Sequence, residues 1–218
     1  MSNYLFPFHT CEIPYNDIHV LAQPYSALVN ATISIHLCSQ YRKANSIQLK
    51  CLFLVYILFE AFHLLSHLIH FQNIEKLQFW IMHCLNYLNC FATLWCIQTF
   101  CGKANTILPT IVLVVDIGIT LMYQGVWSII TGLALFCCII CCHYSKLPYA
   151  FQSQFLYRLL PAFFLLIAAL LNESYHCSWM IHHIGNFPYH VIVEVLGLYL
   201  FSQLTHSLLL IDIGKKID

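Results

Sequence analysis

Long apolar segments separated by short polar ones run through most of the chain. A helix that spans the hydrocarbon core of a bilayer needs roughly 17–25 mostly apolar residues. Segments close to this length occupy residues 20–38, 50–71, 77–100, 106–122, 124–142, 155–171 and 188–210. The stretch 172–187 between the last two is polar enough to be a loop. The pattern therefore predicts an all-α fold, a polytopic bundle of seven transmembrane helices.

The composition indicates that lipid solvates much of this surface. Hydrophobic residues make up 60% of the chain and charged residues only 8%, and the mean hydropathy is +0.74. A soluble domain averages about 25% charged residues. The net charge of zero gives no reason to expect a nucleic-acid partner. The twelve cysteines, most of them in apolar segments, are expected to be buried thiols rather than a disulfide framework.

The basic residues predict an orientation. Seven crossings place eight of the nine on one side of the membrane: Arg42, Lys43, Lys50, Lys103, Lys146, Arg158, Lys215 and Lys216. Because cytoplasmic loops carry the excess of Lys and Arg, the N-terminus is expected outside or in a lumen and the C-terminus in the cytoplasm. The expected organisation is an extramembrane segment 1–19, a seven-transmembrane domain 20–212 and a cytoplasmic tail 213–218.

An N-glycosylation sequon, Asn172-Glu173-Ser174, falls on the expected outer side of the membrane. Glycosylation there requires passage through the secretory pathway. We therefore expect a multi-pass protein of an endomembrane, in the ER or Golgi, or of the plasma membrane.

Ionisable residues are concentrated in the second apolar segment. A charged side chain at bilayer depth costs at least about 2.5–3.5 kcal/mol, so such residues usually face a cavity and have a partner. Glu60, His63, His67 and His70 are spaced by 3, 4 and 3 residues. This spacing puts them on one helical stripe, and Ser66 lies beside it.

The third and seventh segments carry matching polar stripes. The third has His83, Asn86 and Asn89, and the seventh has His190 and Glu194 one helical turn apart. In the orientation predicted above, these stripes and that of the second segment all lie in the outer half of the membrane. The three stripes are therefore expected to meet.

The combined cluster predicts a metal site. Imidazole and carboxylate groups are ligands for Zn²⁺, and a catalytic zinc takes three protein ligands and keeps one position for water. One alternative is a hydrogen-bond network of His, Asn and Glu that links helix to helix. Another is haem held by histidine pairs on facing helices, although the glutamates suit a harder cation better.

The approach to the first segment contains a motif: Cys11-Glu12, Tyr15, Ala22-Gln23-Pro24-Tyr25-Ser26-Ala27 and Asn30. It resembles the alkaline ceramidases and their wider superfamily of seven-helix membrane hydrolases, which includes the progestin and adiponectin receptor family. In the ceramidases this region binds calcium and has an acidic residue eleven positions after the Glu, where this chain has Gln23. The resemblance implies Glu12 and Asp17 as candidate Ca²⁺ ligands.

The second segment also resembles this family. The family has a Ser four residues before a zinc-binding His, and an Asp at the start of the next helix. Here His67 takes the position of the ligand and His63 that of the Ser, with Ser66 one residue away. No Asp follows, and Gln78 and His83 are the nearest polar residues.

The seventh segment reads His190-Val-Ile-Val-Glu194, where the family has His-x-x-x-His. The resemblance spans nearly the whole chain and implies a zinc-dependent hydrolase of lipid amides, with a ceramide-like or other sphingolipid-like membrane lipid as substrate. The implied zinc ligands are His67, His190 and Glu194. The residues implied as general acid or base, or as support for the ligands, are His63, Ser66, His83 and Glu60.

A second class of function stays open because the family's Ser and Asp, which are implicated in catalysis, are out of register in this chain. The alternative is a catalytically inactive, receptor-like or scaffold protein that keeps the seven helices and a structural metal site.

Overall fold

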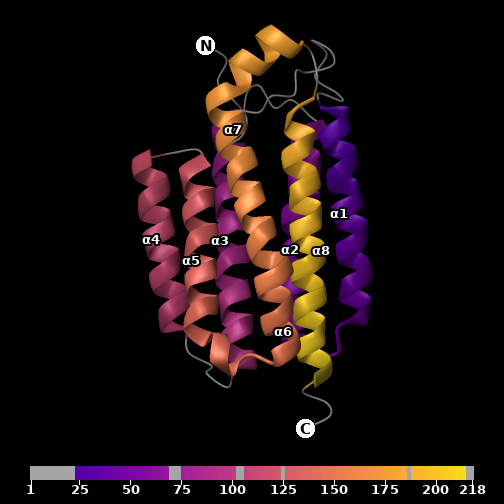
Figure 1. Ribbon diagram of the computed structural model, residues 1–218, viewed down its shortest axis with the longest axis vertical. Coiled ribbons are helices and arrows are strands. Elements are labelled where there is room, and N and C mark those ends of the chain that lie inside the picture. The colour runs from indigo at the N-terminus through magenta and orange to yellow at the C-terminus, as the bar shows by residue number, and fades with distance from the viewer. Residues whose placement is uncertain (1–22, 69–74, 102–105, 124–125, 186–187, 215–218) are drawn as a thin grey trace.

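The computed structural model describes residues 23–68, 75–101, 106–123, 126–185 and 188–214. Within these ranges the chain is all-α and has no strand. The helices are α1 (Pro24–Lys43), α2 (Ile47–Leu68), α3 (Glu75–Phe100), α4 (Ile107–Tyr123), α5 (Val126–His143), α6 (Tyr149–Gln154), α7 (Leu160–Ile184) and α8 (His190–Gly214). A 3₁₀ turn (Tyr144–Lys146) precedes α6, and a π-helix (Phe155–Leu159) joins α6 to α7. The long helices stand side by side in an elongated bundle (Figure 1).

Helices in this bundle are apolar enough to cross a membrane. Among the described residues, the stretches that are long and apolar enough are Ile47–Leu68, Tyr149–Cys177 and His190–Asp212. Large apolar side chains are also exposed on the outside of the bundle, among them Ile35, Val114, Met122 and Phe164. Exposed apolar surface of this kind is rare on soluble monomers and marks contact with a membrane or a partner. Together these features indicate a membrane protein.

Helix α2 is central to the packing, because it contacts α1, α3 and α8. Helix α8 also packs on α1 and α7, while α4 and α5 extend the bundle on the side away from α1 (Figure 1). Among the largest fully buried side chains are Ile33 and Leu37 of α1 and Phe53 and Tyr56 of α2. The packing brings the polar stripes of α2 and α8 together.

The sixth apolar segment belongs to a longer helical stretch than the sequence predicts. Helix continues from Tyr149 to Ile184 through α6, the π-helix and α7. The prediction of a loop at 172–187 is therefore wrong for residues 172–184. Polar residues do not end a helix, and the stop comes at Gly185, whose φ of 93° is in the left-handed region that favours glycine. The π-helix directly precedes the first turn of α7, where Pro161 lacks a backbone N–H donor.

The cysteines are distributed differently from the prediction of buried thiols. Among the free cysteines of the described residues, Cys96 is buried, whereas Cys38, Cys51, Cys84, Cys138, Cys141 and Cys142 are exposed. A thiol is apolar enough to face lipid as well as a protein core, so its position in an apolar segment does not reveal its burial. Cys177, near the end of α7, is disulfide-bonded.

One end of the bundle carries Arg42, Lys43, Lys50 and Lys146, and we call it the basic end. There a carboxylate of α8 caps the N-terminal end of α2. Oδ2 of Asp212 accepts hydrogen bonds from the backbone N–H groups of Asn45 (2.7 Å) and Ser46 (3.2 Å). These amides precede the first turn of α2, where N–H groups lack intrahelical acceptors. Asp212, only 5% exposed, therefore links the last turns of α8 to the start of α2.

We expect Asp212→Ala to destabilise the bundle by about 1–3 kcal/mol, because two amides lose a charged acceptor. Thermal unfolding of the purified protein in detergent would then occur roughly 2–4 °C lower for each kcal/mol lost. Ser39→Ala, at an exposed position of α1, is the control and should leave Tm unchanged. Equal Tm values for Asp212→Ala and the wild type would contradict this role of Asp212.

Candidate metal centre

Two pairs of residues, each spaced by one helical turn, meet between α2 and α8. His63 and His67 come from α2, and His190 and Glu194 come from α8; the i,i+4 spacing puts both members of a pair on one face. All four are buried, and one ligand atom from each lies within 4.8 Å of the others. This group, which we call the metal group, could hold a metal ion. It unites the three ligands implied by the sequence and adds His63.

Four of the six separations between these ligand atoms are close to those around a four-coordinate ion. Nε2 of His63 and Nε2 of His67 are 3.2 Å apart. Oε1 of Glu194 lies 2.8 Å from Nε2 of His190, 3.3 Å from Nε2 of His67 and 3.5 Å from Nε2 of His63. Metal–nitrogen bonds of about 2.0–2.1 Å give a tetrahedron with edges of about 3.3 Å. The separations given above range from 2.8 Å to 3.5 Å, so they lie around this edge length.

Hydrogen bonds on the far side of two imidazoles define their tautomers. Nδ1 of His67 donates to Oε1 of Gln23 (2.6 Å). Nδ1 of His190 donates to the carboxylate of Glu173 (2.9 and 3.0 Å). With its proton on Nδ1, a neutral imidazole presents the lone pair of Nε2 to the centre. Metal-binding histidines are nearly always held in this way.

As neutral imidazoles, His67 and His190 therefore present acceptor atoms to the centre. In that state Nε2 of His190 and Oε1 of Glu194 present lone pairs to each other at 2.8 Å, while Nε2 of His63 lies 3.2 Å from Nε2 of His67. A contact between two acceptors in a buried site needs a proton or a metal ion between the atoms. One metal ion would satisfy all four atoms, whereas a single proton bridges only one pair. The donor set thus fits a metal ion.

A second carboxylate lies beside the metal group. Glu60 is 1% exposed, and its Oε2 is 3.8 Å from Nδ1 of His63. With its amide nitrogen facing the carboxylates, Asn30 donates to Oε2 of Glu194 (2.9 Å) and to Oε2 of Glu60 (3.2 Å), and its Oδ1 lies 3.3 Å from Nε2 of His67. Ionised carboxylates can only accept hydrogen bonds, so this orientation satisfies both groups. Asn30 therefore links the predicted catalytic residue Glu60 to the metal group.

The other residues singled out from the sequence lie apart from the metal group. The hydroxyl of Ser66 donates to the carbonyl of Phe62 (2.9 Å), within its own helix. His83, 1% exposed, lies on α3 and lines the cavity described next. Glu12 and Asp17, the candidate calcium ligands, lie outside the described residues.

A cavity of about 210 Å³ lies beside the metal group, inside the bundle. Glu60, His63 and Glu194 form part of its wall. The apolar part of the wall includes Phe163, Leu166, Leu170, Leu200 and Leu204. Among the described residues, His67 and His190 are not part of this wall. The metal group thus has a closed side, formed by His67 and His190, and a side that faces the cavity.

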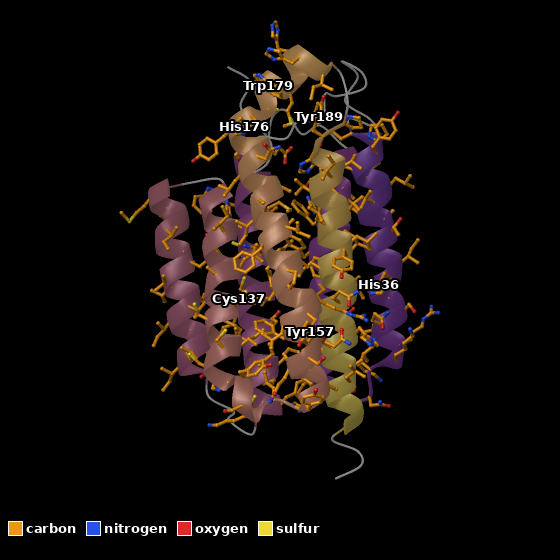
Figure 2. The ribbon with its side chains drawn as sticks, in the orientation of Figure 1. His36, Cys137, Tyr157, His176, Trp179 and Tyr189 are labelled. Carbon is orange, nitrogen blue, oxygen red and sulfur yellow. The ribbon has the colours of Figure 1, made fainter. Side chains whose placement is uncertain are left out.

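The metal group lies toward the end of the bundle opposite the basic end. Tyr189, directly before His190, is buried between the ends of α7 and α8 (Figure 2). Its hydroxyl lies 3.5 Å from the carbonyl oxygen of Met180 and 3.4 Å from that of Gly185. Figure 2 shows Trp179 on α7 near the same end of the bundle. Tyr189 therefore connects the end of α7 to the start of α8, directly before the first residue of the metal group.

Sequence patterns did not identify three residues of this centre as site residues. Gln23 and Asn30 belong to the motif at the first apolar segment, but that motif suggested a calcium site; their spacing of seven residues places them on one helical face. Glu173 falls in the stretch predicted as a loop. Its hydrogen bond to His190 joins residues seventeen positions apart, and no local pattern reveals such a contact.

Comparison with known proteins does not place the chain in a family. No family model matches it, and no curated protein or solved structure matches it. The function is therefore argued from the metal group and its cavity.

We expect Glu173→Ala to weaken Zn²⁺ or Co²⁺ binding about 10–100-fold, because His190 loses the carboxylate that orients its ring. Competition against a chromogenic chelator measures the affinity in purified protein. Asn172→Ala changes the exposed neighbour on α7 and should bind like the wild type. Wild-type affinity in Glu173→Ala would show that the carboxylate does not support a metal ligand.

Proposed function

We propose that this chain is a zinc-dependent membrane hydrolase that cleaves an amide bond in a lipid. The observation that carries the proposal is the position of the metal group at the wall of a largely apolar cavity inside the bundle. Ligand sites of this kind combine an apolar surface with a few convergent polar groups. An amphiphile fits this site, with its chain along the apolar wall and its polar bond at the metal group.

Zinc is the proposed ion because the donors are imidazole nitrogens and a single carboxylate oxygen, whereas Mg²⁺ and Ca²⁺ take oxygen ligands. When bound, zinc would supply a Lewis acid and a water whose pKa is lowered to about 7. Haem does not suit the site. The ring centroids of His67 and His190 are 5.3 Å apart, which leaves no room for a macrocycle between them.

The surroundings of each residue support different roles. His67 and His190 are the fixed ligands, because the Nδ1 of each is held by a hydrogen bond. Glu194 and His63 face the cavity, where a substrate carbonyl would lie. Glu60 is near Nδ1 of His63 and also lines the cavity. We assign Glu60 and His63 to proton transfer toward the leaving amine.

We place the chain across the membrane seven times, with the metal group near the outer or lumenal face. The gathering of Arg42, Lys43, Lys50 and Lys146 at the basic end supports a cytoplasmic position for that end. Cys177 lies toward the opposite end and is disulfide-bonded, which fits an oxidising compartment. The proposed location is an endomembrane or the plasma membrane.

A relationship to the alkaline ceramidases, and with it a ceramide-like substrate, is part of the proposal. It is supported by the positions of His67, His190 and Glu194, which carry the motif resemblance and belong to one metal group. The Gln23 that replaces an acidic residue of the family motif has a role consistent with this assignment. It accepts the hydrogen bond that orients His67.

Purified wild-type protein is expected to contain about one zinc ion per chain, measured by elemental analysis. His190→Ala should reduce the zinc content strongly, because the variant lacks one of the fixed ligands. His206→Ala removes an exposed histidine from the same helix and should keep the wild-type content. A wild-type preparation without stoichiometric zinc would contradict the proposal.

A second candidate function follows from the number of donors. Four protein ligands fill a tetrahedral site, and structural zinc sites are closed in this way. If His63, His67, His190 and Glu194 all bind at once, the ion would hold α2 to α8 without taking part in a reaction. The chain would then be a receptor-like or scaffold protein.

Hydrolysis of an N-acyl sphingoid base in detergent distinguishes the two functions. We expect chelator-sensitive release of fatty acid that returns when zinc is added. Glu60→Gln should lower the rate roughly 10²–10⁴-fold by removing the proton-transfer group, with zinc content unchanged. If zinc is present but the wild type releases no more fatty acid than His190→Ala, the scaffold function is correct.

A further inference from the structure

The cavity has a second polar wall, formed by α3. His83, Asn86 and Asn89 all line the cavity, and their spacing of three residues places them on one stripe of the helix. His83 is 1% exposed and Asn89 is 7% exposed. This wall is separate from the metal group, which comes from α2 and α8.

A hydrogen bond between α2 and α3 shows how the two polar walls are aligned. The hydroxyl of Thr93 donates its proton to the backbone carbonyl of Asn89 (2.7 Å). Because Thr93 has no second hydroxyl proton, the hydroxyl of Tyr56 is the donor in its hydrogen bond with Oγ1 of Thr93. Consecutive helices α2 and α3 run antiparallel (Figure 1), and each rises about 1.5 Å per residue. Glu60 lies four residues after Tyr56, and Asn89 lies four residues before Thr93. Glu60 and Asn89 therefore lie at similar depths, within about one helical turn of each other.

The same counting aligns the next turn. His63 lies seven residues after Tyr56, and Asn86 lies seven residues before Thr93, so these two also lie at similar depths. All four of the paired residues line the same cavity. The amides of Asn86 and Asn89 on α3 thus line the cavity at depths similar to those of His63 and Glu60 on α2.

Asn89 presents an acceptor that the described part of the protein does not satisfy. Its Oδ1 is buried, and no described residue donates a hydrogen bond to it. Buried acceptors of this kind are rare because leaving one without a donor is costly. Since Asn89 lines the cavity, a ligand there can supply the missing donor.

We infer that Asn89, with Asn86 and His83 beside it, forms a binding site for a hydroxyl group on the ligand of this cavity. The partner must be a donor, since a group that only accepts cannot satisfy a carbonyl oxygen. The N–H of the reacting amide is one bond from its carbonyl and stays near the metal group. The donor on the α3 side is therefore a hydroxyl further along the polar head.

This inference defines a ligand class: an amphiphile whose head extends from the metal group to α3 and carries at least one hydroxyl on the amine side. The identity of the reacting end rests on the proposed function. The hydroxyl site itself concerns binding alone and can be tested without turnover.

Two non-hydrolysable probes differ only in this group: N-(2-hydroxyethyl)hexadecane-1-sulfonamide and its O-methyl ether. Their Kd values for purified protein in detergent can be measured from tryptophan fluorescence or thermal stabilisation. We expect the wild type to bind the hydroxyl probe roughly 3–10-fold more tightly than the ether, as one neutral hydrogen bond implies. Asn89→Leu should reduce this ratio to about one.

Gln98→Leu is the matched control. It also removes a buried side-chain amide from α3, but Gln98 does not line the cavity, so the wild-type ratio should remain. Asn89→Ala repeats the test if Asn89→Leu does not yield folded protein.

A wild-type ratio near one, as expected if water alone satisfies Asn89, overturns the inference. Retention of the wild-type ratio in both Asn89 variants overturns it as well. Zinc content and hydrolysis are measured on the same preparations. If the wild type lacks zinc or hydrolysis but still prefers the hydroxyl probe, the proposed function is wrong and the hydroxyl site stands. If zinc and hydrolysis are present but the two probes bind equally, the hydroxyl site is wrong.

Discussion

Nitrogen and oxygen atoms that converge in the interior of a membrane protein need protons or a cation between them, and residues on or beside α1, α2, α7 and α8 take part in this convergence. Helices α2 and α8 supply the inward-facing atoms of the metal group. The polar residue before α1, Gln23, and a carboxylate of α7, Glu173, hold the two fixed imidazoles from behind. Without a cation, these acceptors would oppose one another in a medium of low dielectric constant. Binding of an ion by the metal group would therefore be thermodynamically linked to the packing of α1, α2, α7 and α8.

The pairing of residues in the metal group was predictable because each pair is local in sequence. His63 with His67, and His190 with Glu194, share a helical face by spacing alone, and the predicted orientation of the helices brought both pairs to one depth. Glu173 could not be predicted in the same way. It lies in a polar stretch that was predicted to be a loop, and its role depends on α7 continuing to Ile184. The approximate positions of the helices followed from apolarity, whereas seven crossings and the orientation stay predictions.

Polar residues reveal the inward face of these helices, and apolar residues do not. In a soluble helix the apolar side marks the core, but lipid accepts apolar side chains on the outside as readily as the protein core does. The stripe of His83, Asn86 and Asn89 therefore indicated a face of α3 that does line the cavity. The cysteines carried no such information, and the exposure of Cys51 and Cys138 contradicts their expected burial.

Whether the proposed ion takes three protein ligands or four decides between catalysis and a structural role, and His63 is the residue on which this depends. The rings of His67 and His190 are held on their far sides by contacts of 2.6 Å and 2.9 Å. The corresponding contact of His63, from Nδ1 to Glu60, is 3.8 Å. A structural ligand needs the same support as its neighbours, whereas a group that exchanges protons with a substrate needs a nearby carboxylate and access to the cavity. His63 has both of the latter, which favours three ligands and an open position facing the cavity.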